Sequence, residues 1–193
     1  DGLTQRRNRE AFDAIELAGR VLADMRNDST ESVLLGTPLP FPILIAPVAY
    51  HKLVHPDGEI ATALGASAVS AVMAVSTQSS VAVEEIAKAA RTALWFQLYM
   101  QERREDTLRL VRRAEDAGCT ALVVTVDAPV SGVRNAEQRA GFQLAGHVRP
   151  VHTAGFPAPV TTAGPGESPV FKGLLANAPT WRDIAWLKAQ TAL

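Results

Sequence analysis

Hydroxyl, carboxylate and guanidinium groups follow one another closely in the stretch 120–134, TALVVTVDAPVSGVR. Its first part is a short, apolar and β-branched run, interrupted only by Thr125, as expected for a strand that is buried on both faces. Asp127 ends this run, and Arg134 lies in the loop beyond it. Ligands of parallel α/β proteins bind beyond the carboxyl ends of the strands, so these three side chains lie where a binding site is expected.

Three earlier apolar runs also end in small or polar residues. The first precedes the small residues at 47–49, the second precedes Ser76, and the third contains Gln97. Helical patterns lie between the runs, and strands that alternate with helices predict a parallel sheet with right-handed crossovers. Four such units suit either a (β/α)8 barrel or a doubly wound sheet. The four runs are 42–46, 71–75, 94–98 and 121–126, and the helices are 58–68, 83–90 and 103–117.

Each polar residue near a strand end also has a purely structural interpretation. Ser76 and Thr125 could satisfy backbone groups at the strand ends. Tyr99 could be a packing aromatic residue, and Arg134 a solvated charge in a loop. Gln97 is more informative, because an amide inside an apolar strand needs hydrogen-bond partners.

The chain beyond the fourth run is less regular. Four prolines and three glycines in 154–169 predict an irregular loop within a longer insertion at 141–179. An insertion of this length is either a lid or a bland linker, and composition does not separate the two. Helical pattern resumes after Thr180, a suitable N-cap, and continues to Lys188.

Composition indicates a globular chain in a reducing, cytoplasmic compartment. The 193 residues are 47% hydrophobic and carry a net charge of −1, so electrostatics favours no nucleic-acid partner. No apolar run is long enough to span a bilayer, and no leader is expected. The single cysteine, Cys119, excludes an internal disulfide and is expected to be an inert structural thiol. The spacing of the histidines predicts no metal site; they are His51, His55, His147 and His152.

Several longer segments resemble one known family. They closely resemble the FMN-dependent 2-hydroxy acid oxidases and dehydrogenases, which include glycolate oxidase, lactate oxidase, lactate monooxygenase and mandelate dehydrogenases. The resemblance implies a (β/α)8 barrel, of which this chain, as a single domain over 1–193, supplies about the first four βα units. The matching segments are RRNREAFDAI (6–15), PILIAPVAYHKLVHPDGE (42–59), FQLYMQERR (96–104), VRRAEDAGCTALVVTVDAP (111–129) and APTWRDIAWL (178–187).

The resemblance also implies binding roles. The backbone at 47–49 would lie against the flavin ring of FMN, and polar side chains would hydrogen-bond the flavin edges. Arg134 would hold the substrate carboxylate, which a guanidinium fork matches well, and the Tyr99 hydroxyl would approach the substrate oxygen atoms. The implied cofactor-binding residues are Pro47, Val48, Ala49, Ser76, Gln97, Tyr99 and Thr125.

The implied reaction is the oxidation of an (S)-2-hydroxy acid to a 2-oxo acid, with oxygen or another electron acceptor reoxidising the flavin. The family places its catalytic histidine in a later His-Gly-Gly-Arg motif, which does not occur in these 193 residues, so no catalytic residue is assigned. Three accounts of this absence remain open: a fragment of a full enzyme, a half-barrel completed by a second chain, or a non-catalytic binding or assembly subunit. The family further implies a homo-oligomer, expected to be a tetramer.

Overall fold

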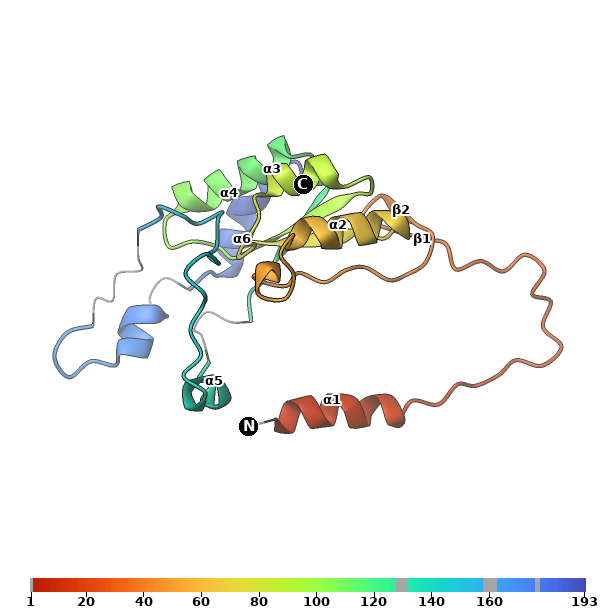
Figure 1. Ribbon diagram of the computed structural model, residues 1–193, viewed down its shortest axis with the longest axis horizontal. Coiled ribbons are helices and arrows are strands. Elements are labelled where there is room, and N and C mark those ends of the chain that lie inside the picture. The colour runs from red at the N-terminus through yellow and green to blue at the C-terminus, as the bar shows by residue number, and fades with distance from the viewer. Residues whose placement is uncertain (1, 128–131, 158–162, 176–177) are drawn as a thin grey trace. The chain divides into compact units, whose positions relative to one another are not determined.

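The computed structural model describes residues 2–127, 132–157, 163–175 and 178–193 (Figure 1). Part of the predicted loop 154–169 and the proline after Asp127 therefore lie outside the described residues. The chain divides into two compact units. One consists of Asp1–Thr30 and Val133–Gln143, and the other of Glu31–Gly132 and Leu144–Leu193.

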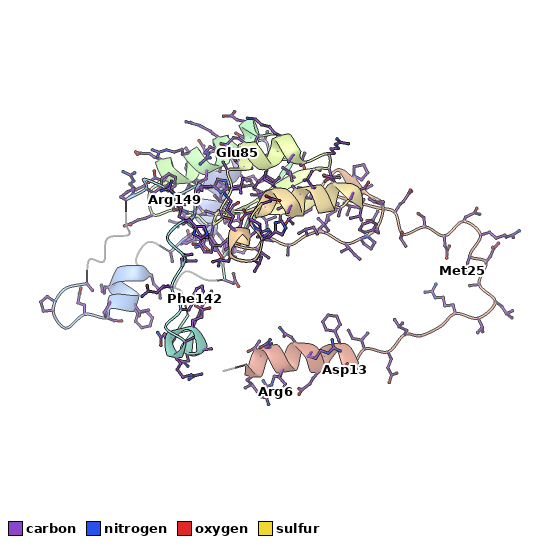
Figure 2. All side chains as sticks on the ribbon, in the orientation of Figure 1. Arg6, Asp13, Met25, Glu85, Phe142 and Arg149 are labelled. Carbon is purple, nitrogen blue, oxygen red and sulfur yellow. The ribbon has the colours of Figure 1, made fainter. Side chains whose placement is uncertain are left out.

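The smaller unit contains two helices, α1 (Leu3–Asp13) and α5 (Asn135–Arg139). The first overlaps the segment 6–15 that resembles the family, whereas the second lies in a region expected to be loop. No residue of α1 is buried. Phe12 is 72% exposed, and Met25, labelled in Figure 2, is 64% exposed.

The larger unit is built on a parallel sheet with the strand order β3-β4-β5. Its strands are β3 (Met73–Ser76), β4 (Leu94–Leu98) and β5 (Ala121–Val124). Ser76 pairs with Gln97, and Gln97 in turn pairs with Val123. These strands confirm three of the four predicted runs to within a few residues.

The first predicted strand, 42–46, is wrong as an extended strand. Only Ile45 pairs with β3, through a parallel bridge to Met73. Pro42 and Pro47 flank this bridge and have no N–H groups to donate to a ladder. The Ile43 N–H is instead bonded locally, to the Phe41 carbonyl oxygen at 2.9 Å. The position of the first barrel strand is therefore occupied by a single bridge.

A short antiparallel hairpin, which the sequence pattern did not predict, precedes this region. It consists of β1 (Ser32–Leu34) and β2 (Thr37–Leu39). Leu35 and Gly36 join the strands with φ angles of 48° and 75°. Positive φ at both turn residues is the geometry that suits a two-residue hairpin, but Leu-Gly lacks the usual Asn or Asp signal.

The helices of the larger unit lie where hydrophobic periodicity predicted them. Each of them contributes one or more buried residues to the main core, which also contains side chains of the sheet. Gly118 stops the third helix with a φ of 82°, and Thr180 starts the last through a capping box with Asp183. The α-helices are α2 (Glu59–Ala68), α3 (Val83–Ala89), α4 (Arg104–Asp116) and α6 (Trp181–Lys188). A 3-10 helix spans His51–Leu53, and a π-helix spans Pro169–Leu174. None of the described helices is long and apolar enough to cross a membrane.

The two faces of the sheet carry different side chains. Alternate residues of β3 and β4 point toward the helices and form the main core, in which Val75, Phe96 and Leu98 are fully buried. The opposite face carries a smaller apolar cluster around Trp95, which the hairpin residue Leu39 joins. In a barrel this second face is the interior, so the sheet has the polarity that a (β/α)8 fold requires.

Candidate functional site

The carboxyl ends of the three strands join Ser76, Gln97 and Thr125 in one chain of hydrogen bonds. Ser76 ends β3, Gln97 lies near the end of β4, and Thr125 directly follows β5. The Ser76 hydroxyl donates to Gln97 Oε1 at 3.2 Å. Gln97 Nε2 donates to Thr125 Oγ1 at 2.8 Å. Three residues singled out in the sequence therefore meet at one edge of the sheet.

The orientation of the Gln97 amide is fixed by its surroundings. Its Oε1 accepts a second bond, from the Thr77 N–H at 3.2 Å. An oxygen that faces two donors cannot be exchanged with the nitrogen, so the Nε2 group must face Thr125. Nε2 carries two N–H groups, and the bond to Thr125 uses one of them. The network can thus offer an N–H and the Thr125 hydroxyl to an acceptor beyond the strand ends.

Thr77 connects these strand ends and was missed in the sequence. Its hydroxyl donates to the Gln97 carbonyl oxygen at 2.6 Å and accepts the Tyr99 N–H at 3.1 Å. Its own N–H also reaches the Gln97 carbonyl oxygen, at 3.0 Å. Thr77 is buried. One threonine therefore fixes the backbone on both sides of the Gln97–Tyr99 segment.

Tyr99 lies just beyond β4, at the same end of the sheet as Gln97, and is half-buried. The Gln101 side chain donates to the Tyr99 carbonyl oxygen at 2.7 Å. Together with the bond from its N–H to Thr77, this contact holds the Tyr99 backbone at both ends. The tyrosine side chain is thus carried by a fixed segment of backbone.

The segment Pro47-Val48-Ala49 follows the single bridge at Ile45 and adopts no regular structure. Val48 is 56% exposed. Tyr50, the next residue, has a φ of 55°, and its N–H donates to the Gln78 carbonyl oxygen at 3.2 Å. A positive φ is costly for a tyrosine, so the surrounding contacts hold this turn in place.

Glu59 makes some of those contacts. No role was predicted for it from the sequence, although it is the last residue of the segment 42–59 that resembles the family. Its buried carboxylate accepts the His51 N–H at 3.1 Å, the Ser80 N–H at 2.8 Å and the Ser80 hydroxyl at 2.7 Å. Burial acts to raise the pKa of Glu59, but the bonds from Ser80 and His51 outweigh it and hold the pKa below its ordinary value. Glu59 therefore ties the turn after Tyr50 to the loop after β3.

Arg134 belongs to the smaller unit, whereas the strand ends belong to the larger unit. It stands at the N-terminus of α5, with its side chain 72% exposed. Its guanidinium contacts Glu137 Oε1 at 3.1 Å. All seven predicted cofactor-binding residues thus lie in the larger unit, where hydrogen bonds join Ser76, Gln97 and Thr125. The roles predicted for these residues and for Arg134 stay predictions.

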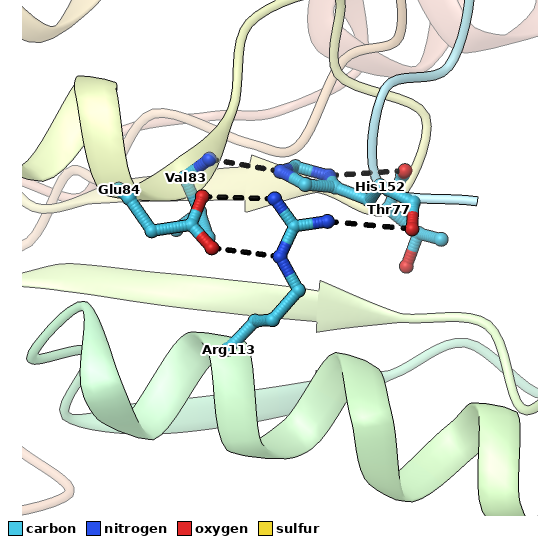
Figure 3. Close-up of polar contacts among 5 residues, drawn as sticks. All are labelled: Thr77, Val83, Glu84, Arg113 and His152. Carbon is cyan, nitrogen blue, oxygen red and sulfur yellow. Dashed lines mark hydrogen bonds and ion pairs between the residues drawn. The ribbon is translucent and has the colours of Figure 1, made fainter. Parts of the chain in front are cut away.

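His152 reaches the sheet from the segment after β5 and is buried (Figure 3). Its Nε2 accepts the Val83 N–H at 2.9 Å, and its Nδ1 lies 3.2 Å from the Thr77 carbonyl oxygen. The ring meets Phe96 edge to face, with the centroids 5.4 Å apart. Burial and then the nearby Arg113 lower the pKa of His152. Local sequence contained no signal for this role of His152, because its partners lie 69 and 75 residues away.

An ion pair covers this histidine. Arg113 of α4 donates two parallel hydrogen bonds to the Glu84 carboxylate of α3, at 2.7 and 2.9 Å. Another guanidinium nitrogen lies 3.4 Å from the His152 carbonyl oxygen (Figure 3). The pair lowers the pKa of Glu84 and raises that of Arg113. Among the described residues, no group of His, Cys, Asp and Glu side chains could hold a metal ion.

Comparison with known proteins places this geometry in context. The family model for FMN-dependent dehydrogenases matches residues 1–193. An L-lactate oxidase of Alicycliphilus denitrificans is 43% identical over 187 residues, which are 96% of this chain and 51% of that protein. A peroxisomal (S)-2-hydroxyacid oxidase of Arabidopsis thaliana is 38% identical over 203 residues, covering 100% of this chain and 53% of that protein.

The fold has solved counterparts as well. A mandelate oxidase variant in complex with (S)-mandelic acid superposes with a TM-score of 0.81 and 35% identity, over 96% of this chain and 49% of that one. The chain spans about half the length of the curated relatives and solved structures that it matches.

Proposed function

The chain belongs to the FMN-dependent dehydrogenase family, and from this premise we propose that the whole protein binds FMN and oxidises an (S)-2-hydroxy acid to a 2-oxo acid. The relatives are named for lactate, (S)-2-hydroxy acids and mandelate, all of which share a carboxylate and a hydroxyl on the adjacent carbon. This shared unit defines the proposed substrate class.

The hydrogen-bond chain from Ser76 through Gln97 to Thr125 is the observation that supports flavin binding best. The polar edge of a flavin presents carbonyl oxygens and unprotonated ring nitrogens, which accept hydrogen bonds, and one ring N–H, which donates. Gln97 Nε2 and the Thr125 hydroxyl are donors of the required kind, at the carboxyl ends of parallel strands. Buried polar groups at such a position fit a bound polar ring system better than they fit a purely structural role.

We assign cofactor contacts to the two segments that border this network. The backbone at 47–49 has only small or apolar side chains, and a planar ring could approach it closely. Tyr99 would border the flavin and direct its hydroxyl toward the substrate oxygen. The proposed FMN-binding residues are Pro47, Val48, Ala49, Ser76, Gln97, Tyr99 and Thr125.

The reaction removes two electrons and two protons from the substrate. Bound FMN supplies the acceptor for the hydride equivalent that leaves the α-carbon. Arg134 would hold the substrate carboxylate through paired N–H donors and so orient the α-carbon. Tyr99 would hydrogen-bond the hydroxyl oxygen as it becomes a carbonyl oxygen. The base that accepts the hydroxyl proton is not assigned to any residue of this chain.

Anaerobic reduction of the purified full-length protein tests this function. The protein should carry an oxidised flavin spectrum that bleaches on addition of L-lactate, glycolate or (S)-mandelate, and D-lactate should have no effect. Bleached protein exposed to oxygen, or to an artificial electron acceptor, then identifies the acceptor class. A colourless protein that takes up no FMN, or a flavin that none of these acids reduces, would contradict the proposal.

A variant of Arg134 tests the proposed substrate contact. Arg134→Met should raise KM for the hydroxy acid strongly while flavin content stays unchanged, because the anion would lose its charged partner. An unchanged KM would remove Arg134 from the substrate site.

A further inference from the structure

We propose that His152 is a positioning residue for the flavin site, acting as a neutral imidazole through Thr77 on Gln97 and Tyr99. This inference rests on the function proposed above, since it assigns those residues to FMN. It concerns a residue from the segment after β5, which the sequence left as a lid or a linker. His152 itself would touch neither cofactor nor substrate.

The hydrogen bonds of His152 define its tautomer. The Val83 N–H can only donate, so the Nε2 that it faces must carry no proton. The proton of the neutral ring is then on Nδ1, which donates to the Thr77 carbonyl oxygen. Both ring nitrogens are satisfied in this one state. A protonated ring would place a second N–H against the Val83 N–H and lose that bond.

Thr77 transmits the position of His152 to the strand ends. His152 holds the Thr77 carbonyl oxygen, and the remaining polar groups of Thr77 bind the next strand. Its hydroxyl bonds the Gln97 carbonyl oxygen and the Tyr99 N–H, and its N–H contacts Gln97 Oε1. Loss of the His152 bond would leave the Thr77 carbonyl group without this partner and allow Thr77 to move. The orientation of the Gln97 amide depends on Thr77, whose N–H donates to Gln97 Oε1.

The charged groups around His152 favour its neutral state. Arg113 of α4 lies against its backbone oxygen and opposes a second positive charge. Glu84 of α3 acts in the opposite direction, but its carboxylate is already paired with Arg113. The buried Phe96 ring supplies no charge and excludes water from the edge of the imidazole. These surroundings therefore favour the neutral imidazole of His152.

A second anchor holds the same segment in place. The Val151 N–H donates to the Ser79 carbonyl oxygen at 3.1 Å, and Val148 is buried. Ser79, like Thr77 and Val83, belongs to the stretch that connects β3 to α3. Hydrogen bonds thus hold the segment around His152 against the stretch between β3 and α3.

Two substitutions in the full-length protein loaded with FMN test this role. His152→Leu removes both hydrogen bonds, whereas His152→Gln retains an acceptor and a donor at similar spacing but cannot be protonated. The leucine variant should bind FMN about tenfold more weakly, as fluorescence quenching measures, which corresponds to the loss of one or two hydrogen bonds. Its flavin absorption bands should shift, and its kcat should fall more than its KM changes. The glutamine variant should recover most of the affinity and the spectrum.

The pH dependence of FMN affinity is an independent test, and it does not require the leucine variant to fold. FMN affinity of the unmodified protein should decline as the pH falls through the pKa of His152, which burial and Arg113 hold below the ordinary histidine value of 6.5, whereas the affinity of His152→Gln should stay flat. His147→Gln, at an exposed histidine of the same segment, is the matched control and should behave as the unmodified protein. Nitrogen NMR of the imidazole should report the Nδ1–H tautomer.

The outcomes separate the two proposals. An unmodified protein that binds FMN and oxidises a hydroxy acid, together with a folded leucine variant of unchanged FMN affinity and spectrum, would overturn the role of His152 alone. A glutamine variant with the same pH profile as the unmodified protein would also overturn it. An unmodified protein that takes up no FMN would overturn both proposals.

Discussion

The two faces of the β3-β4-β5 sheet are built from the same strands but serve different purposes. The helix-facing side is apolar along the whole strand, with Val75, Phe96 and Leu98 fully buried. The other side is apolar only around Trp95 and changes to a hydrogen-bonded polar network at Gln97, two residues later. Because successive side chains alternate in direction, one strand can supply the core with one set of residues and a site with the other. The fold and the site can therefore be disturbed separately.

The helix-facing side should show the largest effect on stability. Phe96→Ala leaves a cavity in the main core, so it should lower the free energy of unfolding by about 3–5 kcal/mol. Urea unfolding of the full-length protein measures this. Phe12→Ala, at a residue that is 72% exposed, is the control and should change stability by less than about 0.5 kcal/mol. A small loss at Phe96 would show that the helices do not depend on this packing.

The opposite side should lose binding more than stability. Gln97→Leu removes the amide and leaves Ser76, Thr77 and Thr125 without their shared partner. Stability should fall by about 1–3 kcal/mol, while FMN affinity should fall by more than tenfold. Equilibrium dialysis with FMN and urea unfolding separate the two quantities. If FMN binds this variant normally, the polar end of the sheet is structural rather than functional.

Glu59 allows the comparison to be tested through pH. Its pKa in the folded protein lies below the ordinary 4.5, so its contribution to stability is complete above that pH and is lost as the pH falls below it. The free energy of unfolding of the unmodified protein should therefore fall more steeply below pH 4.5 than the other acidic groups alone would cause. Glu59→Gln should be less stable at pH 7 and show a flatter dependence below pH 4.5. Parallel curves for the two proteins would contradict this account.

The smallest effect is expected at the apolar part of the inner face. Trp95 is 7% exposed, and its indole N–H finds no hydrogen-bond partner among the described residues. Trp95→Phe removes this unpaired donor together with some packing volume, and the two changes oppose each other. Stability should change by less than about 1.5 kcal/mol. FMN affinity, measured as above, should be unchanged, and a large loss would place Trp95 within the site.

Local sequence pattern was sufficient for the regular elements that pack on the sheet. The run that became β4 and the helix after Thr180 were predicted because periodicity and capping depend on neighbouring residues. The hairpin around Leu35 and Gly36 was missed, because its turn lacks the usual residues and its conformation depends on Leu39 packing against the inner cluster.

The site was predicted less completely than the fold. Ser76, Gln97 and Thr125 could be singled out because each is a polar residue at the end of an apolar run. Thr77 and His152 could not, since their importance comes from partners on other elements. Cys119 was predicted to be inert, and burial followed by the charge of Glu84 raises its pKa to about 12.

The anchoring of His152 has a consequence for length variation among relatives. The hydrogen bonds of the His152 imidazole anchor the chain midway between β5 and α6. The connection between these elements therefore consists of two shorter loops rather than one long loop. Closing a loop of twice the length costs only about 0.6 kcal/mol. Insertions near Gly166 would lengthen only the second loop, between His152 and α6. Homologues with a longer or shorter loop there should still share the same strand ends.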